Sequence, residues 1–236
     1  MKRARPALLI CWLSLSALLF AQTNGAASPA TVSFTLDFPQ STPDHYSIVV
    51  DSSGTANYRS GTAKAASDST SEGETTSDSD QPYHYSFTVS PATRDHIFDL
   101  AARANFFSGD INYKKHNIAS TGEKTLTYKD DHRNTRAQYN YTTNPAVQEL
   151  TSLFQRLSAT LEYGRHLDEA FHYQKLALDE QLKSMEQQAD QNGLLEIQAV
   201  APILKKIADD SSVINVTRAR AQRLLAKAGT TSSSPH

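Results

Sequence analysis

Residues 31–38 read TVSFTLDF and alternate strictly between polar and apolar side chains. The apolar members of this stretch are Val32, Phe34, Leu36 and Phe38. A period of two residues is typical of a β-strand that buries one face and leaves the other in water. The stretch therefore predicts a half-buried strand near the start of the folded part of the chain.

The same alternation recurs in HYSIVV at 45–50, in 55–59 and in 83–89. Gly54 ends a turn between the stretches 45–50 and 55–59, which predicts that these two form a hairpin. A second hairpin is expected over 125–141, and together these stretches predict an antiparallel sheet of about five or six strands. Seven tyrosines fall in the predicted strands: Tyr46, Tyr58, Tyr83, Tyr85, Tyr128, Tyr139 and Tyr141. We favour packing over binding as their role, because half-buried strands favour tyrosine.

Helices are predicted by their start signals and by apolar spacing. Ser90-Pro91 and Asn144-Pro145 each place a capping side chain before a proline at the first helical position. The second of these helices is expected to be interrupted at Gly164. A helical run then ends at Asn192-Gly193, another covers 194–208, and the last begins at Ser211 or Ser212 and ends before Gly229.

These elements predict an α+β fold, in which an antiparallel sheet with one inserted helix precedes a C-terminal layer of about four helices. We expect a signal peptide at 1–27, an α+β domain at 28–162, a helical region at 163–229 and a disordered tail at 230–236. The segment 61–81 is acidic and has no large apolar side chain, which predicts a disordered loop. Its acids do not fit a calcium-binding EF-hand loop, because a serine stands where the bidentate glutamate belongs.

The first 27 residues predict export. A basic start is followed by an apolar run at 7–21 and by small polar residues, the order of a secretory signal peptide. The apolar run is shorter than the roughly 20 residues that span a bilayer, so an uncleaved anchor is the weaker alternative. Cleavage is expected after Ala21 or Ala27, which removes Cys11 and Trp12 and shifts the formal net charge from -2 to -5 through loss of three basic residues. We expect a secreted or periplasmic protein without disulfides or a transmembrane segment.

Four motifs follow one another in a suggestive order: HYSIVV with Gly54 and Tyr58, then FTVSP at 87–91, TGEKTLTY at 121–128 and NPAVQEL at 144–150. Over residues 44–157 this order resembles uncharacterised domains of exported bacterial proteins. The resemblance implies a strand-turn-strand unit, a helix, a second hairpin and a closing helix, but no activity. Such relatives often have a cysteine pair around a glycine just before the first strand of this unit, the place that PQSTP at 39–43 holds here without cysteine.

The C-terminal segment 202–225 is similar to a single HEAT-type helical repeat. A single repeat cannot build a solenoid, which needs about three stacked units. Two antiparallel helices that cover a core are the simpler interpretation.

Two clusters of charged side chains are candidate sites. Glu162, His166 and Glu169 are spaced four and three residues apart, so they share one helix face and could bind a divalent metal. A solvated charged face is the alternative that we favour for them. The second cluster consists of Arg220, Arg223 and Lys227. It could contact an anionic lipid or an acidic partner, or it could complement the dipole of its helix.

The chain has no phosphate-binding glycine loop and no nucleophile elbow, and its slightly acidic charge does not fit a nucleic-acid binder. No cofactor is expected. The sequence therefore favours an exported, non-enzymatic binding or interaction module of the bacterial cell envelope, with an unknown envelope protein or ligand as partner. The alternative is a metal-dependent or hydrolytic periplasmic enzyme that uses the stripe around His166.

Overall fold

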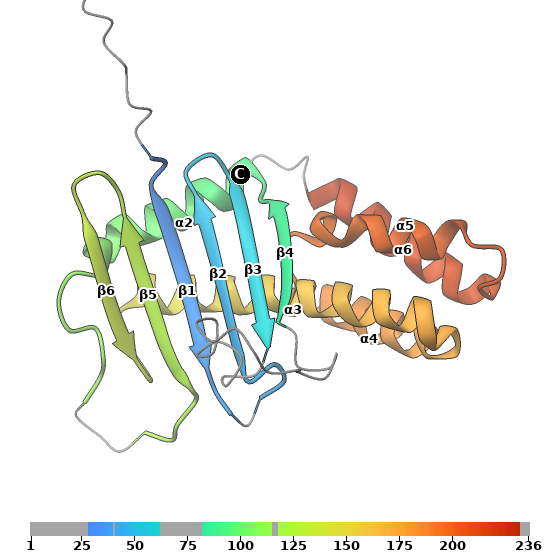
Figure 1. Cartoon of the computed structure of the whole chain (residues 1–236), viewed down its shortest axis with the longest axis horizontal. Helices are drawn as coiled ribbons and strands as arrows, with labels where there is room; N and C mark the ends of the chain where they lie inside the picture. The colour runs from blue at the N-terminus through green and yellow to red at the C-terminus, as the bar shows by residue number, and fades with distance from the viewer. Residues whose placement is uncertain (1–27, 40, 62–81, 115–117, 232–236) are drawn as a thin grey trace, which may run out of the picture.

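The computed structural model describes residues 28–39, 41–61, 82–114 and 118–231. Six strands form one antiparallel sheet in the order β4-β3-β2-β1-β5-β6 (Figure 1). Their bounds are β1 Thr31–Asp37, β2 His45–Asp51, β3 Thr55–Gly61, β4 Tyr83–Thr88, β5 Glu123–Lys129 and β6 Asn134–Tyr139. Five α-helices complete the described part, so the predicted α+β class is confirmed.

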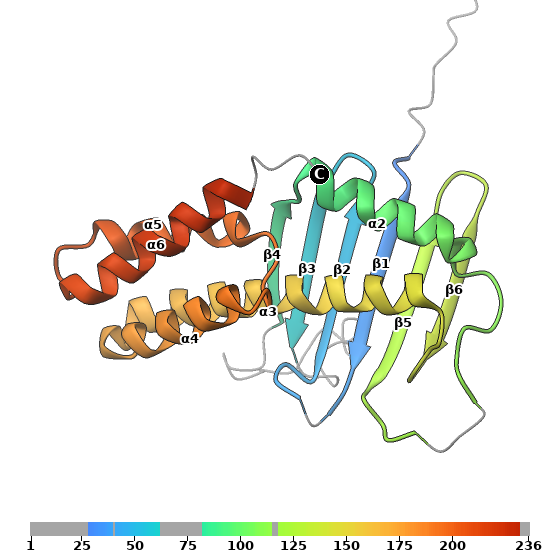
Figure 2. The ribbon, with the colours of Figure 1, turned by 180° about the vertical axis from the view of Figure 1, so that it is seen from behind.

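The alternation of 31–38 decides which face of the sheet is buried. Phe34 in the inner strand β1 is fully buried, and it lies opposite Ile48 of β2 and Leu126 of β5. Its ring stacks on that of Phe154, with the centroids 5.4 Å apart. The intervening residues form the other face, where Thr35 lies opposite Thr125. None of the described helices lies on the polar face (Figures 1 and 2).

Helices α2 (Pro91–Arg103) and α3 (Pro145–Tyr173) cover the apolar face of the sheet (Figure 2). Both predicted caps are confirmed, since the Ser90 hydroxyl accepts from the Thr93 N–H and the Asn144 side chain accepts from two N–H groups of the first turn. With 29 residues, α3 is about 43 Å long, whereas six strands span only about 24 Å across their axes. The C-terminal half of α3 therefore extends beyond β4 (Figures 1 and 2).

Helices α4 (Leu178–Asp190) and α5 (Ala201–Asp209) pack on this extended half of α3, and α6 (Asn215–Thr231) packs on α4 and α5. Short 3₁₀ turns lie at η2 (Asn105–Phe107), η3 (Lys175–Ala177) and η4 (Ile197–Val200). Side chains from all four helices form an apolar core there: Leu167, Leu182, Met185, Leu204 and Leu224. The chain thus has a sheet-and-helix part and a helical part that share α3.

The expected helix break at Gly164 is wrong. Helix α3 continues through Gly164, so the boundary expected between 162 and 163 falls inside one helix. The helix ends instead before Gln174, whose backbone is non-helical at φ −145° and ψ 56°. Tertiary packing outweighs the roughly 1 kcal/mol by which glycine disfavours a helix interior. Helix α6 also continues past its expected end at Gly229, to Thr231.

Three predicted segments lie largely or wholly outside the described residues: the signal peptide at 1–27, positions 62–81 of the acidic loop and 232–236 of the tail. Gly61, expected to open the loop, belongs to β3. Among the residues that the structure describes, no helix is both long and apolar enough to cross a membrane.

Candidate functional site

Glu162, the first member of the predicted stripe, is buried and not solvated. One carboxylate oxygen, Oε1, accepts from the Tyr58 hydroxyl at 2.7 Å and from the Ser60 hydroxyl at 2.6 Å. The other, Oε2, accepts from Arg165 Nε at 2.8 Å. Burial and the nearby carboxylate raise the pKa of Tyr58, which keeps its hydroxyl a donor. Glu162 thus joins α3 to β3, and the solvated face that we favoured is wrong at this position.

The other two members of the stripe do not join Glu162 in a ligand set. His166 is half-buried and its Nε2 lies 2.7 Å from Arg165 Nη2, while burial and that guanidinium lower the pKa of its imidazole. Glu169 is exposed and lies 3.7 Å from Arg165 Nη1. Within the described ranges, no group of three or more His, Cys, Asp or Glu side chains could hold a metal ion. The metal hypothesis therefore has no support in the geometry of these residues.

The predicted basic cluster on α6 faces acids of α4. Arg220 pairs with Asp179 at 3.0 Å and with Glu186 at 2.8 Å, and Arg223 pairs with Glu186 at 2.7 Å. Lys227 pairs with Asp190. These ion pairs join α6 to α4, so all three basic side chains are paired with carboxylates of the protein itself.

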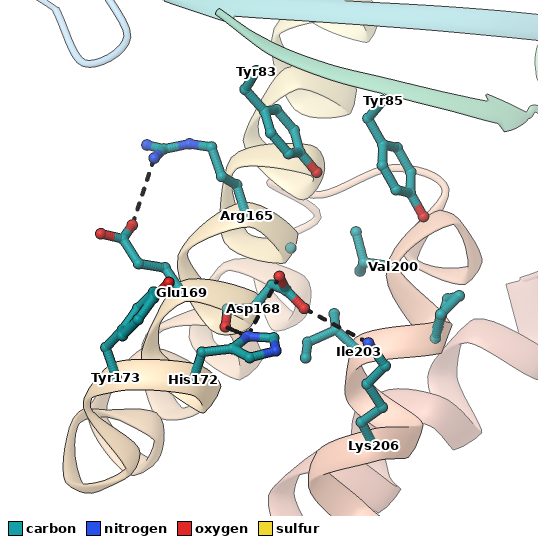
Figure 3. A pocket seen from close by; sticks show the side chains of 12 residues that line it. Tyr83, Tyr85, Arg165, Asp168, Glu169, His172, Tyr173, Val200, Ile203 and Lys206 are labelled. Atoms are coloured by element: carbon teal, nitrogen blue, oxygen red, sulfur yellow. Dashed lines mark hydrogen bonds and ion pairs between the residues drawn. The ribbon is translucent and has the colours of Figure 1, made fainter. Parts of the chain in front are cut away.

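A groove that the sequence did not predict lies where α3 passes beyond the sheet. It is bounded by β4, the C-terminal half of α3, and α5 with η4, and its volume is about 570 Å³ (Figure 3). We call it the edge groove. Its aromatic and aliphatic lining consists of Tyr83, Tyr85, Tyr173, Val200, Pro202 and Ile203. Its charged and titratable lining consists of Arg165, Asp168, Glu169, His172 and Lys206.

Two tyrosines of β4 form the wall of the edge groove next to the sheet. The rings of Tyr83 and Tyr85 are stacked with centroids 6.2 Å apart, and both side chains extend toward α3 and α5 (Figure 3). The Tyr85 hydroxyl donates to the Ala199 carbonyl at 2.7 Å, which joins β4 to η4. Burial raises the pKa of Tyr83 to about 12 and raises that of Tyr85 as well, so both are neutral phenols at physiological pH.

The seven tyrosines predicted to lie in strands differ in how deeply they are buried. Four of them are buried in the core: Tyr46, Tyr58, Tyr128 and Tyr139. Packing is therefore confirmed as their role. Tyr83 and Tyr85 are only partly buried, and Tyr141 is exposed beyond the end of β6.

The charged side chains around the edge groove pair with one another. Lys206 Nζ lies 3.9 Å from Asp168 Oδ1, and the Asp168 backbone carbonyl lies 2.7 Å from His172 Nδ1 (Figure 3). Arg165 pairs with Glu162 and Glu169, as described above. The groove therefore combines an apolar interior with a rim whose charges largely cancel.

The base of the groove is set by a close approach of the Val200 side chain to the backbone of α3 at Gly164. A Cβ atom placed on Gly164 would lie 2.4 Å from Val200 Cγ1, closer than real atoms come. Glycine at this position therefore allows η4 to pack directly on α3. The sequence shows a glycine inside a helical stretch, but only the folded structure shows that Val200 packs against it.

Replacing Gly164 by alanine is expected to destabilise the protein by about 1 to 3 kcal/mol, because overpacking outweighs the gain in helix propensity. In the double variant with Val200→Ala the clashing methyl is absent, so the two effects should couple by about 1 kcal/mol. Urea unfolding of the two single variants and the double variant measures this coupling. A Gly164→Ala variant more stable than the wild type would contradict the close approach.

A second buried carboxylate, which the sequence analysis did not single out, holds η4 in place. Glu196 Oε2 accepts from the Ser90 N–H at 2.9 Å and Oε1 accepts from the Ser90 hydroxyl at 2.7 Å and from the Thr93 hydroxyl. The preceding residue, Leu195, is bound to Thr160 of α3 through both its N–H and its carbonyl. The segment that leads into the groove is thus anchored to the start of α2 and to α3.

No family model and no curated protein matches this chain. The geometry of the edge groove is therefore the basis for assigning a function.

Proposed function

We propose that this protein is an exported binding module of the bacterial cell envelope, and that its ligand binds in the edge groove. The observation that carries the proposal is the concave surface itself. Ligand sites are concave and mostly apolar, with a few polar groups that fix orientation. Two stacked tyrosines, Val200 and Ile203 supply the apolar part, and the paired charges of the rim supply the polar groups.

A binding role fits the groove better than a catalytic one. The carboxylate of Asp168 faces Lys206, and Arg165 is shared between Glu162 and Glu169. Side chains held in this way orient a ligand without supplying a reactive group. The metal-dependent alternative around His166 has no comparable support, because the carboxylate of Glu162 is already bound by two hydroxyls and a guanidinium.

Export is the part of the proposal that rests on residues 1–27. The protein purified from the producing cells should have an intact mass that places its N-terminus at Gln22 or Ser28. It should also lack tryptophan emission, because Trp12 is the only tryptophan of the chain. A mass that includes residues 1–27 would contradict cleavage.

Ligand binding in the edge groove can be followed with a tryptophan placed at its mouth. Tyr173 lines the groove and is 83% exposed, so a Tyr173→Trp variant in a Trp12→Phe background gives a single reporter. We expect fractions of a cell-envelope extract to change its emission. The change should be lost when Tyr83→Ser is added and kept when Tyr141→Ser is added, since Tyr141 does not line this groove. A response that survives Tyr83→Ser would contradict binding there.

A further inference from the structure

Strand β4 is an edge of the sheet. It pairs with β3 alone among the described strands, and the sheet ends there. The residue that follows, Val89, donates its N–H to the Gly54 carbonyl at 3.0 Å. In an antiparallel pair, alternate residues direct both backbone groups toward the neighbouring strand. The N–H and C=O groups of His84, Ser86 and Thr88 therefore point away from β3.

These outward groups lie along the strand whose inward side chains Tyr83 and Tyr85 line the edge groove. Because α3 and α5 extend beyond β4 on the apolar face, a strand added beside β4 would lie above the helices and not in open solvent (Figures 1 and 2). Adjacent strands are about 4.8 Å apart, and every second side chain points to the same face. Alternate side chains of an added strand would thus point toward Val200 and Ile203, beside the rings of Tyr83 and Tyr85.

Among the described residues, the edge at β4 also lacks the usual protection against strand addition. Exposed edges are commonly blocked by lysine, proline or a bulge, and the stretch 83–88, YHYSFT, has no lysine or proline and pairs with β3 in continuous register. At the opposite edge, beside the end of β6, the Tyr113 N–H donates to the Tyr141 carbonyl at 2.8 Å. The two edges therefore differ, and the unblocked one adjoins the groove.

We infer that the edge groove binds an extended segment of another protein, which pairs with β4 as a seventh strand and places apolar side chains in the groove. The inference rests on the proposed function, which it deepens by naming the class of ligand. Backbone hydrogen bonds to β4 supply affinity, and the groove selects the alternate side chains. Because the charges of the rim cancel, the bound segment is selected by apolar shape rather than by net charge.

Segments of the chain itself fit this description poorly, since the apolar run at 7–21 belongs to the signal peptide that the proposed export removes. Residues 62–81 contain no apolar side chain larger than alanine, and 232–236 contain only that of Pro235, so neither can supply alternating apolar side chains to the groove. A second copy paired antiparallel through β4 would carry its own α3 and α5 on the same face of the joined sheet. Those helices would enter the space that this copy's helices occupy beyond β4. An extended segment of another protein can carry apolar side chains, and it brings no helices into the space beyond β4.

The test uses peptides of about ten residues, the upper end of natural strand length, selected from a random display library against the full chain. The selected peptides should carry apolar residues at every second position. Ser86→Pro removes an outward N–H, a change that an edge strand tolerates, and should weaken binding of a selected peptide about tenfold or more. Ser86→Thr keeps the N–H and should leave the affinity within about twofold of the wild type.

A second pair of variants separates the two proposals. Tyr83→Ser removes a wall of the groove and should weaken binding, whereas Tyr141→Ser should not. If Tyr83→Ser weakens binding and a folded Ser86→Pro variant does not, the groove stands and strand addition is overturned. If neither variant weakens binding, both proposals are overturned. Strand addition also fails if the library yields no binder, or if light scattering shows a dimer that Ser86→Pro dissociates. Circular dichroism shows whether each variant is folded.

Discussion

Replacing Glu162 by alanine is expected to lower the free energy of unfolding by about 3 kcal/mol. The carboxylate is buried, and its removal leaves the hydroxyls of Tyr58 and Ser60 without their acceptor. Hydrogen bonds to a charged group contribute about 1.5 to 3 kcal/mol each, and partial rearrangement reduces the sum. The loss is large because β3 and α3 are joined here, at the point where α3 leaves the sheet.

Two controls define this effect. Glu162→Gln keeps an oxygen acceptor for both hydroxyls and loses the ion pair with partly exposed Arg165, so it should cost only about 1 kcal/mol. Glu169→Ala removes an exposed carboxylate from the same helix and should change stability by no more than about 0.5 kcal/mol. Urea unfolding compares the three variants. Equal stability of Glu162→Ala and Glu169→Ala would refute the structural role of the buried carboxylate.

Replacing Glu196 by alanine should destabilise the protein by about 2 to 3 kcal/mol. The substitution leaves the Ser90 N–H and the hydroxyls of Ser90 and Thr93 without the carboxylate that accepts from them. Because Glu196 directly precedes η4, the change should also loosen the position of Val200 in the edge groove. Glu196→Gln retains one oxygen acceptor and should cost about half as much.

Hydrogen exchange distinguishes this anchoring role from a general loss of stability. In Glu196→Ala the amides of the first turn of α2 and those of η4 should exchange faster than in the wild type under native conditions. The amides of β1, inside the sheet, should change only through the global free energy of unfolding. Uniform acceleration across the whole chain would contradict a local anchoring role for Glu196.

Local patterns predicted the sheet and its helices well, because each depends on residues close together in sequence. The alternation around Phe34 gave the buried face of the sheet, and Ser90-Pro91 and Asn144-Pro145 gave the helix starts. The error at Gly164 has a different origin. A glycine inside a helix looks like a break until its neighbour Val200, distant in sequence, is known.

The site was harder to predict for the same reason. Glu162, His166 and Glu169 share a helix face by spacing, but spacing does not show that β3 supplies hydroxyls to the first of them. The alternation at 83–89 predicts both tyrosines of β4 on one strand face, and the structure places both in the lining of the groove. Whether β4 is an edge, and whether helices extend beyond it, depends on strand order and helix length in the assembled fold.

Strand addition at β4 is tested by amide hydrogen exchange, measured by NMR with and without a peptide selected against the full chain. Binding beside β4 predicts slower exchange of the outward amides of His84, Ser86 and Thr88. The amides of Tyr85 and Phe87, which already face β3, should change little. Saturating peptide that leaves the three outward amides as exposed as before would contradict the account.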